Sequence, residues 1–104
     1  MLSARKVLRG DSFDLHIREN GKAAFSRLGL VVPKRLARQA CLRNAIKRQG
    51  REAFRQLRGP VTACDIVIRL KRPVTKKPGE AKLQRQNWRR EIESLMDRLA
   101  ARVI

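Results

Sequence analysis

Residues 38–58 constrain the fold more than any other stretch, because two kinds of side chain separate cleanly there on a helix. At 100° per residue, its basic and amide side chains fall within an arc of about 140°. These are Arg43, Asn44, Lys47, Arg48, Arg51, Arg55 and Arg58. An arc of about 120° on another side holds Leu42, Ala45, Ile46, Ala53 and Leu57. The stretch therefore predicts a helix with one buried face and one face that binds negative charge.

The rest of the chain is also strongly basic. Its 104 residues carry a formal net charge of +17, which opposes compaction unless a polyanion relieves the repulsion. Nucleic acid is the first candidate partner and a membrane surface the second, but no apolar run approaches the ~20 residues of a spanning helix. The opening residues MLSARKVLRG lack the apolar segment of a secretory signal. We therefore expect one domain, located in the cytoplasm, with no membrane partner.

Strands are predicted before the basic helix. Residues 13–18 alternate apolar and polar side chains, which is typical of a half-buried strand. His16 belongs to the polar set, so it should lie on the face opposite the apolar side chains. Residues 25–32 predict a second strand, and the Asn-Gly pair between the two favours a hairpin. We expect these two strands to pair antiparallel, with residues 5–9 forming a short extended segment before them.

Another strand and helix are predicted after the basic helix. Gly59 and Pro60 should end the basic helix, and residues 65–70 are rich in β-branched side chains. A strand that follows a helical crossover can lie parallel to an earlier one, and the general rule makes such a crossover right-handed. Residues 80–102 predict a second helix, in which six basic and four acidic residues suggest an ordinary solvated face. Its core stripe should be Trp88, Ile92, Leu95 and Leu99.

No set of side chains predicts catalysis. A zinc site needs about four ligands, whereas the chain has one histidine and two distant cysteines, Cys41 and Cys64. We expect these to be ordinary, mostly buried thiols. A two-metal nuclease needs several converging carboxylates, and the acidic residues here are scattered. His16 is more typical of a surface or cleft than of a catalytic base. The sequence favours binding over catalysis.

The basic helix points to phosphate. Residues 34–58 contain nine Lys or Arg and one acidic residue. Like charges four residues apart destabilise a helix by a few tenths of a kcal/mol per pair, whereas arginine forks match phosphate oxygens. Only four aromatic residues occur, which argues against a reader that stacks single-stranded bases. We expect Phe54 to be core. Gly50 either permits close approach by a neighbouring backbone or is a tolerated weak spot.

Residues 29–55 carry a long motif of fixed spacing. It reads GLVVPKR at 29–35, then A-x-x-RN-x-IKR-x-x-RE-x-FR at 40–55. This motif, and the order of predicted elements from about Arg5 onward, resembles the protein component of bacterial ribonuclease P. The resemblance implies an α/β (α+β) two-layer sandwich with a small mixed, mainly antiparallel sheet, similar to the ribosomal protein S5 domain 2-like fold. It also implies a left-handed β-α-β crossover in place of the right-handed default.

The resemblance further implies a protein that assists an RNA enzyme. In that family a catalytic RNA subunit, with magnesium at its active site, removes the 5′ leader of precursor tRNA. The protein binds this RNA and lines a cleft for the leader. The implied RNA-binding residues are Lys34, Arg35, Arg43, Asn44, Lys47, Arg48, Arg51 and Arg55. The strand with Phe13, Leu15, His16 and Ile17 would form part of the cleft floor. No catalytic residue, metal or cofactor is assigned to the chain itself.

Two features depart from the family pattern. Ala45 replaces a basic residue in the signature and lies about 60° beyond Arg48, so its effect should be to weaken RNA binding. The family's N-terminal helix, one wall of the leader cleft, would end roughly where this sequence starts. We therefore expect one ribonuclease P protein domain over residues 1–104 without that helix, either because the start of the sequence is mis-set or truncated or because the protein lacks this wall of the cleft. A basic ribosome-associated structural protein of similar topology and, less favoured, a protein-only nuclease are the alternatives.

Overall fold

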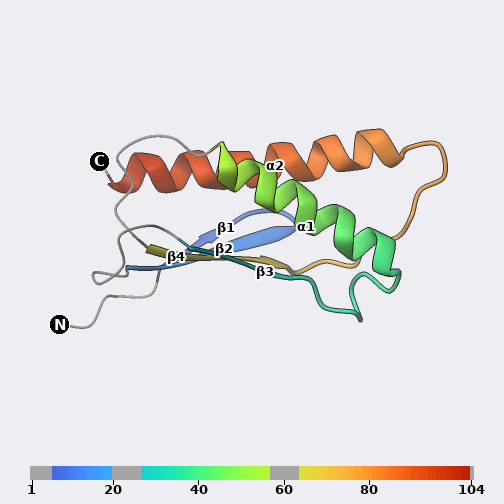
Figure 1. Ribbon diagram of the computed structural model, residues 1–104, viewed down its shortest axis with the longest axis horizontal. Coiled ribbons are helices and arrows are strands. Elements are labelled where there is room, and N and C mark those ends of the chain that lie inside the picture. The colour runs from blue at the N-terminus through green and yellow to red at the C-terminus, as the bar shows by residue number, and fades with distance from the viewer. Residues whose placement is uncertain (1–5, 20–26, 57–63, 104) are drawn as a thin grey trace.

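The computed structural model describes residues 6–19, 27–56 and 64–103, which form four strands and two helices. In chain order these are β1 (Lys6–Arg9), β2 (Phe13–Glu19), β3 (Arg27–Val31), α1 (Ala40–Arg55), β4 (Cys64–Leu70) and α2 (Ala81–Val103). Both helices cover the same face of the sheet, as Figure 1 shows. The predicted two-layer α+β sandwich is therefore confirmed, and the other sheet face carries no helix among these elements.

The strand order is β1-β2-β4-β3. β2 pairs antiparallel with both β1 and β4, whereas β3 pairs parallel with β4. The sheet is thus mixed and mainly antiparallel, as predicted, but the expected pairing of β2 with β3 is wrong. β4 takes a central position because its helix-facing side chains are strongly apolar, with Ile66, Ile68 and Leu70 buried in the core. β3 contains Gly29 and leads to Pro33, which suits an edge strand.

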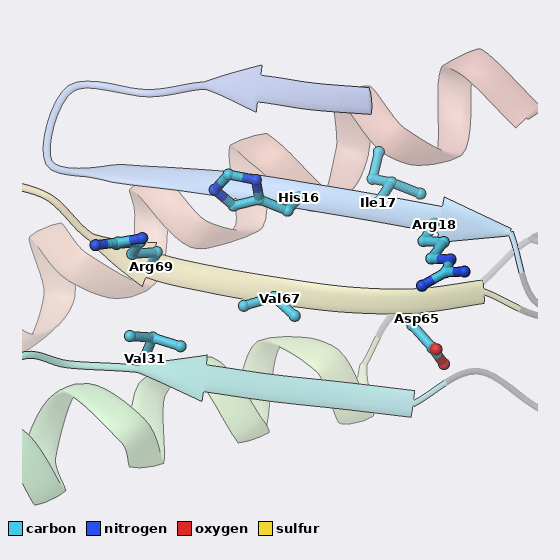
Figure 2. A pocket seen from close by; sticks show the side chains of 7 residues that line it. All are labelled: His16, Ile17, Arg18, Val31, Asp65, Val67 and Arg69. Atoms are coloured by element: carbon cyan, nitrogen blue, oxygen red, sulfur yellow. The ribbon is translucent and has the colours of Figure 1, made fainter. Parts of the chain in front are cut away.

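The connection from β3 through α1 to β4 is left-handed. Figure 2 views the sheet from its open face, with β3 and β4 running in the same direction and the helices behind them. This confirms the crossover implied by the family resemblance and overrides the general right-handed preference. The arrangement places α1 over the β3 edge, with the outward side of the helix free to carry charge.

The core lies between the sheet and the helices. Phe13, Leu15, Ile66 and Ile68 point from the two central strands toward the helices and are fully buried. The predicted stripe of α2 is confirmed, because Trp88, Ile92, Leu95 and Leu99 are all buried. α1 adds Leu42, Ile46 and Ala53 to the same cluster, and Phe54 packs half-buried against it. These contacts fix which face of α1 is turned outward.

Gly50 lets α1 approach β3 closely. A Cβ atom at this position would lie 2.5 Å from Cδ2 of Leu30, well inside van der Waals contact. The neighbour is thus a side chain, and the alternative of close approach by a neighbouring backbone is wrong. Glycine at this position lowers the stability of the helix by about 1 kcal/mol relative to alanine.

α2 also holds the turn between β1 and β2. The Glu91 carboxylate accepts hydrogen bonds from the backbone N–H groups of Ser12 and Phe13, each at 2.8 Å. The N–H of Gly10 donates to the carbonyl of Phe13 at 2.9 Å, and a Cβ at Gly10 would meet that oxygen at 2.7 Å. The turn is therefore packed against the helix, with its buried donors satisfied by a residue near the other end of the chain.

Asp14 makes the stability of this sheet sensitive to acid. Its carboxylate is largely buried and lies 2.9 Å from the ammonium nitrogen of Lys71. Burial raises the pKa of Asp14, but the hydrogen bond and charge of Lys71 outweigh it, so the pKa is lowered from its ordinary value. A carboxyl whose pKa is lowered by folding stabilises the protein above its unfolded-state pKa, and this contribution disappears as the pH falls through the folded-state pKa.

We expect Asp14→Asn to unfold at lower urea concentration than the parent at pH 7. The difference in free energy of unfolding should shrink as the pH falls below about 4, because the parent then loses the same charge. The matched control is Asp11→Asn, since Asp11 and Arg72 form an exposed ion pair that should contribute little. A difference for Asp14→Asn that persists undiminished at pH 2 would contradict the electrostatic explanation.

Candidate nucleic-acid interface

α1 presents the basic surface predicted from the sequence, over the bounds Ala40–Arg55 instead of 38–58. Asn44, Arg48, Arg51 and Arg55 are exposed, and Lys47 is half-buried. We call these five residues the α1 basic face. Two members of the predicted arcs, Leu57 and Arg58, lie outside the described residues. The separation of the two faces is confirmed because the opposite side of the helix packs into the core.

Arg48 and Arg51 are the most available cations of this face. Neither forms an ion pair with another described residue, whereas Arg55 pairs with Glu52 one turn earlier. The hydrogen bond from Arg55 lowers the pKa of Glu52, so this carboxylate stays charged and offsets part of the local positive charge. Ala45 lies half-buried against the core, as the helical wheel predicted. The unpaired positive charge is therefore concentrated on one flank of α1.

Arg43 has a structural role that the sequence did not reveal. Its Nη1 atom donates to the carbonyl oxygens of Ala37 and Arg38, at 2.9 and 2.8 Å. These bonds secure the segment before α1, whose N-cap residue, Gln39, makes no side-chain capping hydrogen bond. Arg43 is half-buried as a result. Its predicted contact with RNA stays a prediction, and at least part of its donor capacity is used within the protein.

Lys34 and Arg35 sit on a fixed turn between β3 and α1. The turn is closed by hydrogen bonds from the N–H groups of Leu36 and Ala37 to the carbonyl of Pro33, at 3.0 and 3.1 Å. Leu36 and Ala37 are buried, which anchors the turn, whereas the two basic side chains are exposed. This part of the predicted site is therefore close to the start of α1 and held at a defined position.

The open face of the sheet contains a hollow of about 390 Å³. Figure 2 shows the side chains that line it: His16, Ile17, Arg18, Val31, Asp65, Val67 and Arg69. His16 lies on this face, as the alternation predicted. Phe13 and Leu15 do not reach it, because they point to the helix layer and are fully buried. Of the predicted cleft residues, only His16 and Ile17 line the hollow, and Phe13 and Leu15 support the strand from behind.

Several residues of this hollow were missed at the level of sequence. Val67 and Arg69 come from β4, and Val67 is the cross-strand partner of both His16 and Gly29. Their signal was the period of two in residues 65–70, which places them opposite Ile66 and Ile68. The hollow combines an apolar floor with arginines at its margin. At one end, Arg27 forms two hydrogen bonds to Asp65, at 3.0 and 3.3 Å.

Other candidate sites are weaker. Cys41 is exposed and free, so the expectation of a mostly buried thiol is wrong for this residue. Its helical position lies beside Arg48, outside the apolar arc, which the wheel could have indicated. Within residues 6–19, 27–56 and 64–103, no three His, Cys, Asp or Glu side chains gather as a metal site. Nor does any helix in these ranges have the length and apolar character needed to cross a membrane.

Comparison with known proteins places the chain in a family. The family model described as Ribonuclease P matches residues 1–100. The ribonuclease P protein component of Azoarcus sp. (strain BH72) is 48% identical over 71 residues, which cover 68% of this chain and 58% of that protein. The corresponding protein of Bordetella parapertussis is 36% identical over 103 residues, covering 95% and 82%. The match to the Azoarcus protein thus spans less than two thirds of its length.

Solved structures support the same assignment. The ribonuclease P protein of Staphylococcus aureus superimposes with a TM-score of 0.73 at 26% identity, covering 95% of this chain and 83% of that one. The Thermotoga maritima protein gives a TM-score of 0.60 at 29% identity, covering 95% and 81%. Both similarities extend over nearly the whole chain, including the strands and helices described above. The chain belongs to the ribonuclease P protein family.

Proposed function

We propose that this chain is the protein subunit of a cytoplasmic ribonuclease P, the ribonucleoprotein that removes the 5′ leader from precursor tRNA. The observation that carries the proposal is the α1 basic face. Arg48 and Arg51 are exposed and make no ion pair with a described residue, while the core holds the opposite side of their helix in place. Family membership supplies the identity of the polyanion: the RNA subunit of the same enzyme.

In this proposal the RNA performs the cleavage and the protein supports it electrostatically. The α1 basic face, with Lys34 and Arg35 beside it, binds backbone phosphates of the RNA subunit. Magnesium belongs to the active site of the RNA. The described residues of the chain bring no cluster of carboxylates together that could replace that site. The contribution of the protein is therefore to neutralise phosphate charge and to orient the two RNA molecules.

The hollow on the open sheet face is the proposed site for the single-stranded leader. Arg18 and Arg69 can meet its phosphates, while Val31 and Val67 offer an apolar surface to sugars and bases. His16 lies between these groups, where its ring can contact a base. The site has little aromatic surface, so it should tolerate many leader sequences because backbone contacts carry no sequence information.

The proposal is tested by reconstitution. Adding the purified protein to a bacterial ribonuclease P RNA should restore 5′-leader removal at a magnesium concentration that is too low for the RNA alone. The protein without RNA should leave precursor tRNA intact. The absence of any stimulation, or cleavage by a protein preparation shown to be free of nuclease contamination, would overturn the proposal. Co-sedimentation with ribosomal particles and no stimulation would support the ribosome-associated alternative instead.

A further inference from the structure

A second basic surface lies on α2, where this helix passes α1. Where α2 passes α1, the structure contains an open groove of about 560 Å³. We call it the α1–α2 groove, and its lining consists of Gln49, Lys82, Arg85, Gln86, Arg89, Arg90 and Glu93. Four of these seven side chains are cationic, one is acidic and none is apolar. The groove is thus built for a ligand of negative charge.

Basic and acidic residues are distributed unevenly along α2, and a count of charges over the whole helix does not show this. Residues 81–90 contain four basic residues and no acidic residue, and the acidic residues of the helix follow from Glu91 onward. Lys82, Arg85 and Arg90 are exposed, as expected of a solvated face, but the charge balance of residues 80–102 as a whole does not extend to the first half of α2. This segregation explains why the groove is cationic.

The placement of these cations also costs helix stability. Lys82 lies in the first turn of α2, which contains no acidic residue, and the helix dipole disfavours positive charge there. Arg85 and Arg89 are four residues apart, a spacing at which like charges repel. Lys82, Arg85 and Arg90 form no ion pair with any other described residue. A bound polyanion would offset both unfavourable effects.

Arg89 is already oriented at the centre of the groove. Its Nε atom lies 3.0 Å from an oxygen of Glu93, and Nη1 donates to Oε1 of Gln49 at 3.2 Å. The Arg89 side chain is only 24% exposed, so packing restricts it as well. A guanidinium held in this way loses less conformational entropy on binding than a free surface arginine.

We propose that the α1–α2 groove binds backbone phosphates of the ribonuclease P RNA subunit and so extends the RNA interface from α1 onto α2. The inference rests on the proposed function, because it takes the same RNA as ligand. Gln49 in the groove directly follows Arg48 of the α1 basic face, so the two surfaces meet along α1. Lys82 to Arg89 spans about 10 Å of helix, enough for more than one phosphate.

The lining favours RNA over a protein partner. Protein interfaces depend on buried aromatic or aliphatic anchors at their centre, and the α1–α2 groove contains no apolar side chain. Arginine guanidinium groups instead suit the bidentate recognition of phosphate oxygens. Three of the four cations of the groove are arginines.

The test compares two double variants of equal charge loss. Lys82→Gln/Arg85→Gln should weaken binding to a bacterial ribonuclease P RNA about tenfold at moderate salt. It should also reduce the slope of log affinity against log salt by roughly 1.5, as expected when about two phosphate contacts are lost. The control is Lys76→Gln/Lys77→Gln, which removes two exposed charges outside the groove and should have little effect. Lys82→Arg/Arg85→Lys should retain affinity, and thermal unfolding verifies that each variant folds.

Two further comparisons distinguish failure of the groove proposal from failure of the proposed function. If Arg48→Ala/Arg51→Ala weakens binding and Lys82→Gln/Arg85→Gln does not, the groove proposal is wrong and the proposed function stands. If neither variant changes affinity, both proposals fail. Binding of precursor tRNA to the assembled holoenzyme is measured in parallel. A loss confined to precursor tRNA would overturn the assignment of the groove to the RNA subunit, as would an equal loss in the Lys76→Gln/Lys77→Gln control.

Discussion

Replacing Arg48 and Arg51 together by alanine should weaken binding of the ribonuclease P RNA subunit by about a hundredfold at moderate salt. Hydrogen bonds to charged groups contribute about 1.5–3 kcal/mol each, and about 1.4 kcal/mol corresponds to a factor of ten. Two lost contacts therefore account for roughly two orders of magnitude. The salt dependence should also become shallower, because fewer counterions are released when the complex forms. Affinity measured by filter binding over a series of salt concentrations checks both effects.

Arg55→Ala provides a graded control on the same helix. Arg55 is also exposed, but its guanidinium is engaged by Glu52, so fewer of its donors are available to phosphate and its removal should cost less affinity than removing either Arg48 or Arg51 alone. All three arginines are exposed, and their loss should change the free energy of unfolding by no more than about 0.5 kcal/mol. An unchanged affinity in the double variant would sink the role assigned to the α1 basic face.

Phe13→Ala should lower the free energy of unfolding by about 3–5 kcal/mol. The side chain is completely buried between the sheet and the helices, and deleting such a ring removes its transfer free energy and leaves a cavity. Since domains are typically stable by only about 5–15 kcal/mol, a large share of the total would be lost. Urea unfolding followed by circular dichroism measures the change. Any loss of leader binding in this variant should follow the fraction of unfolded protein.

His16→Ala is the matched substitution on the opposite face of the same strand. His16 lines the open hollow and lies outside the buried cluster, so stability should change by less than about 1 kcal/mol. Affinity for precursor tRNA should fall while affinity for mature tRNA, which has no leader, stays the same. If Phe13→Ala remained fully folded but lost leader binding selectively, Phe13 would have to contact the leader, and its placement in the core would be wrong.

The elements of the fold could be predicted from the sequence, whereas their neighbours in the sheet could not. Helices and strands can be predicted from the local periodicity of apolar residues. The predicted bounds of α1 and the predicted buried stripe of α2 are therefore close to those observed. Pairing depends on what lies beside a strand in space. The Asn-Gly pair after β2 suggested a simple hairpin, but β2 pairs with β4, whose helix-facing side chains Ile66, Ile68 and Leu70 are all buried. Such a choice depends on contacts between segments that lie far apart in the sequence.

The candidate site was predictable to a similar degree. The α1 basic face follows from a helical wheel, because its members are close in sequence. The bonds from Arg43 to the preceding loop and from Arg89 to Gln49 depend on tertiary contacts that no local pattern encodes. A count of charges over the whole of α2 averaged a strongly basic first half with a nearly balanced second half. The α1–α2 groove could not be predicted from the sequence, because its lining includes Gln49 of α1, which is distant from α2 in the chain.

The hydrogen bonds from Ser12 and Phe13 to Glu91 also bear on how the protein is made. They join positions 79 and 78 residues apart, so the first turn of the sheet is completed by a residue that is synthesised long after the turn itself. β2 likewise can pair with β4 only after this much later segment of the chain has been synthesised. Contacts of such long range slow folding, and nascent chains that stop before α2 leave part of one face of the sheet uncovered and the N–H groups of Ser12 and Phe13 without Glu91 as acceptor. Ribosomes stalled before Glu91 is incorporated should therefore carry chains that a protease readily cleaves within residues 6–19.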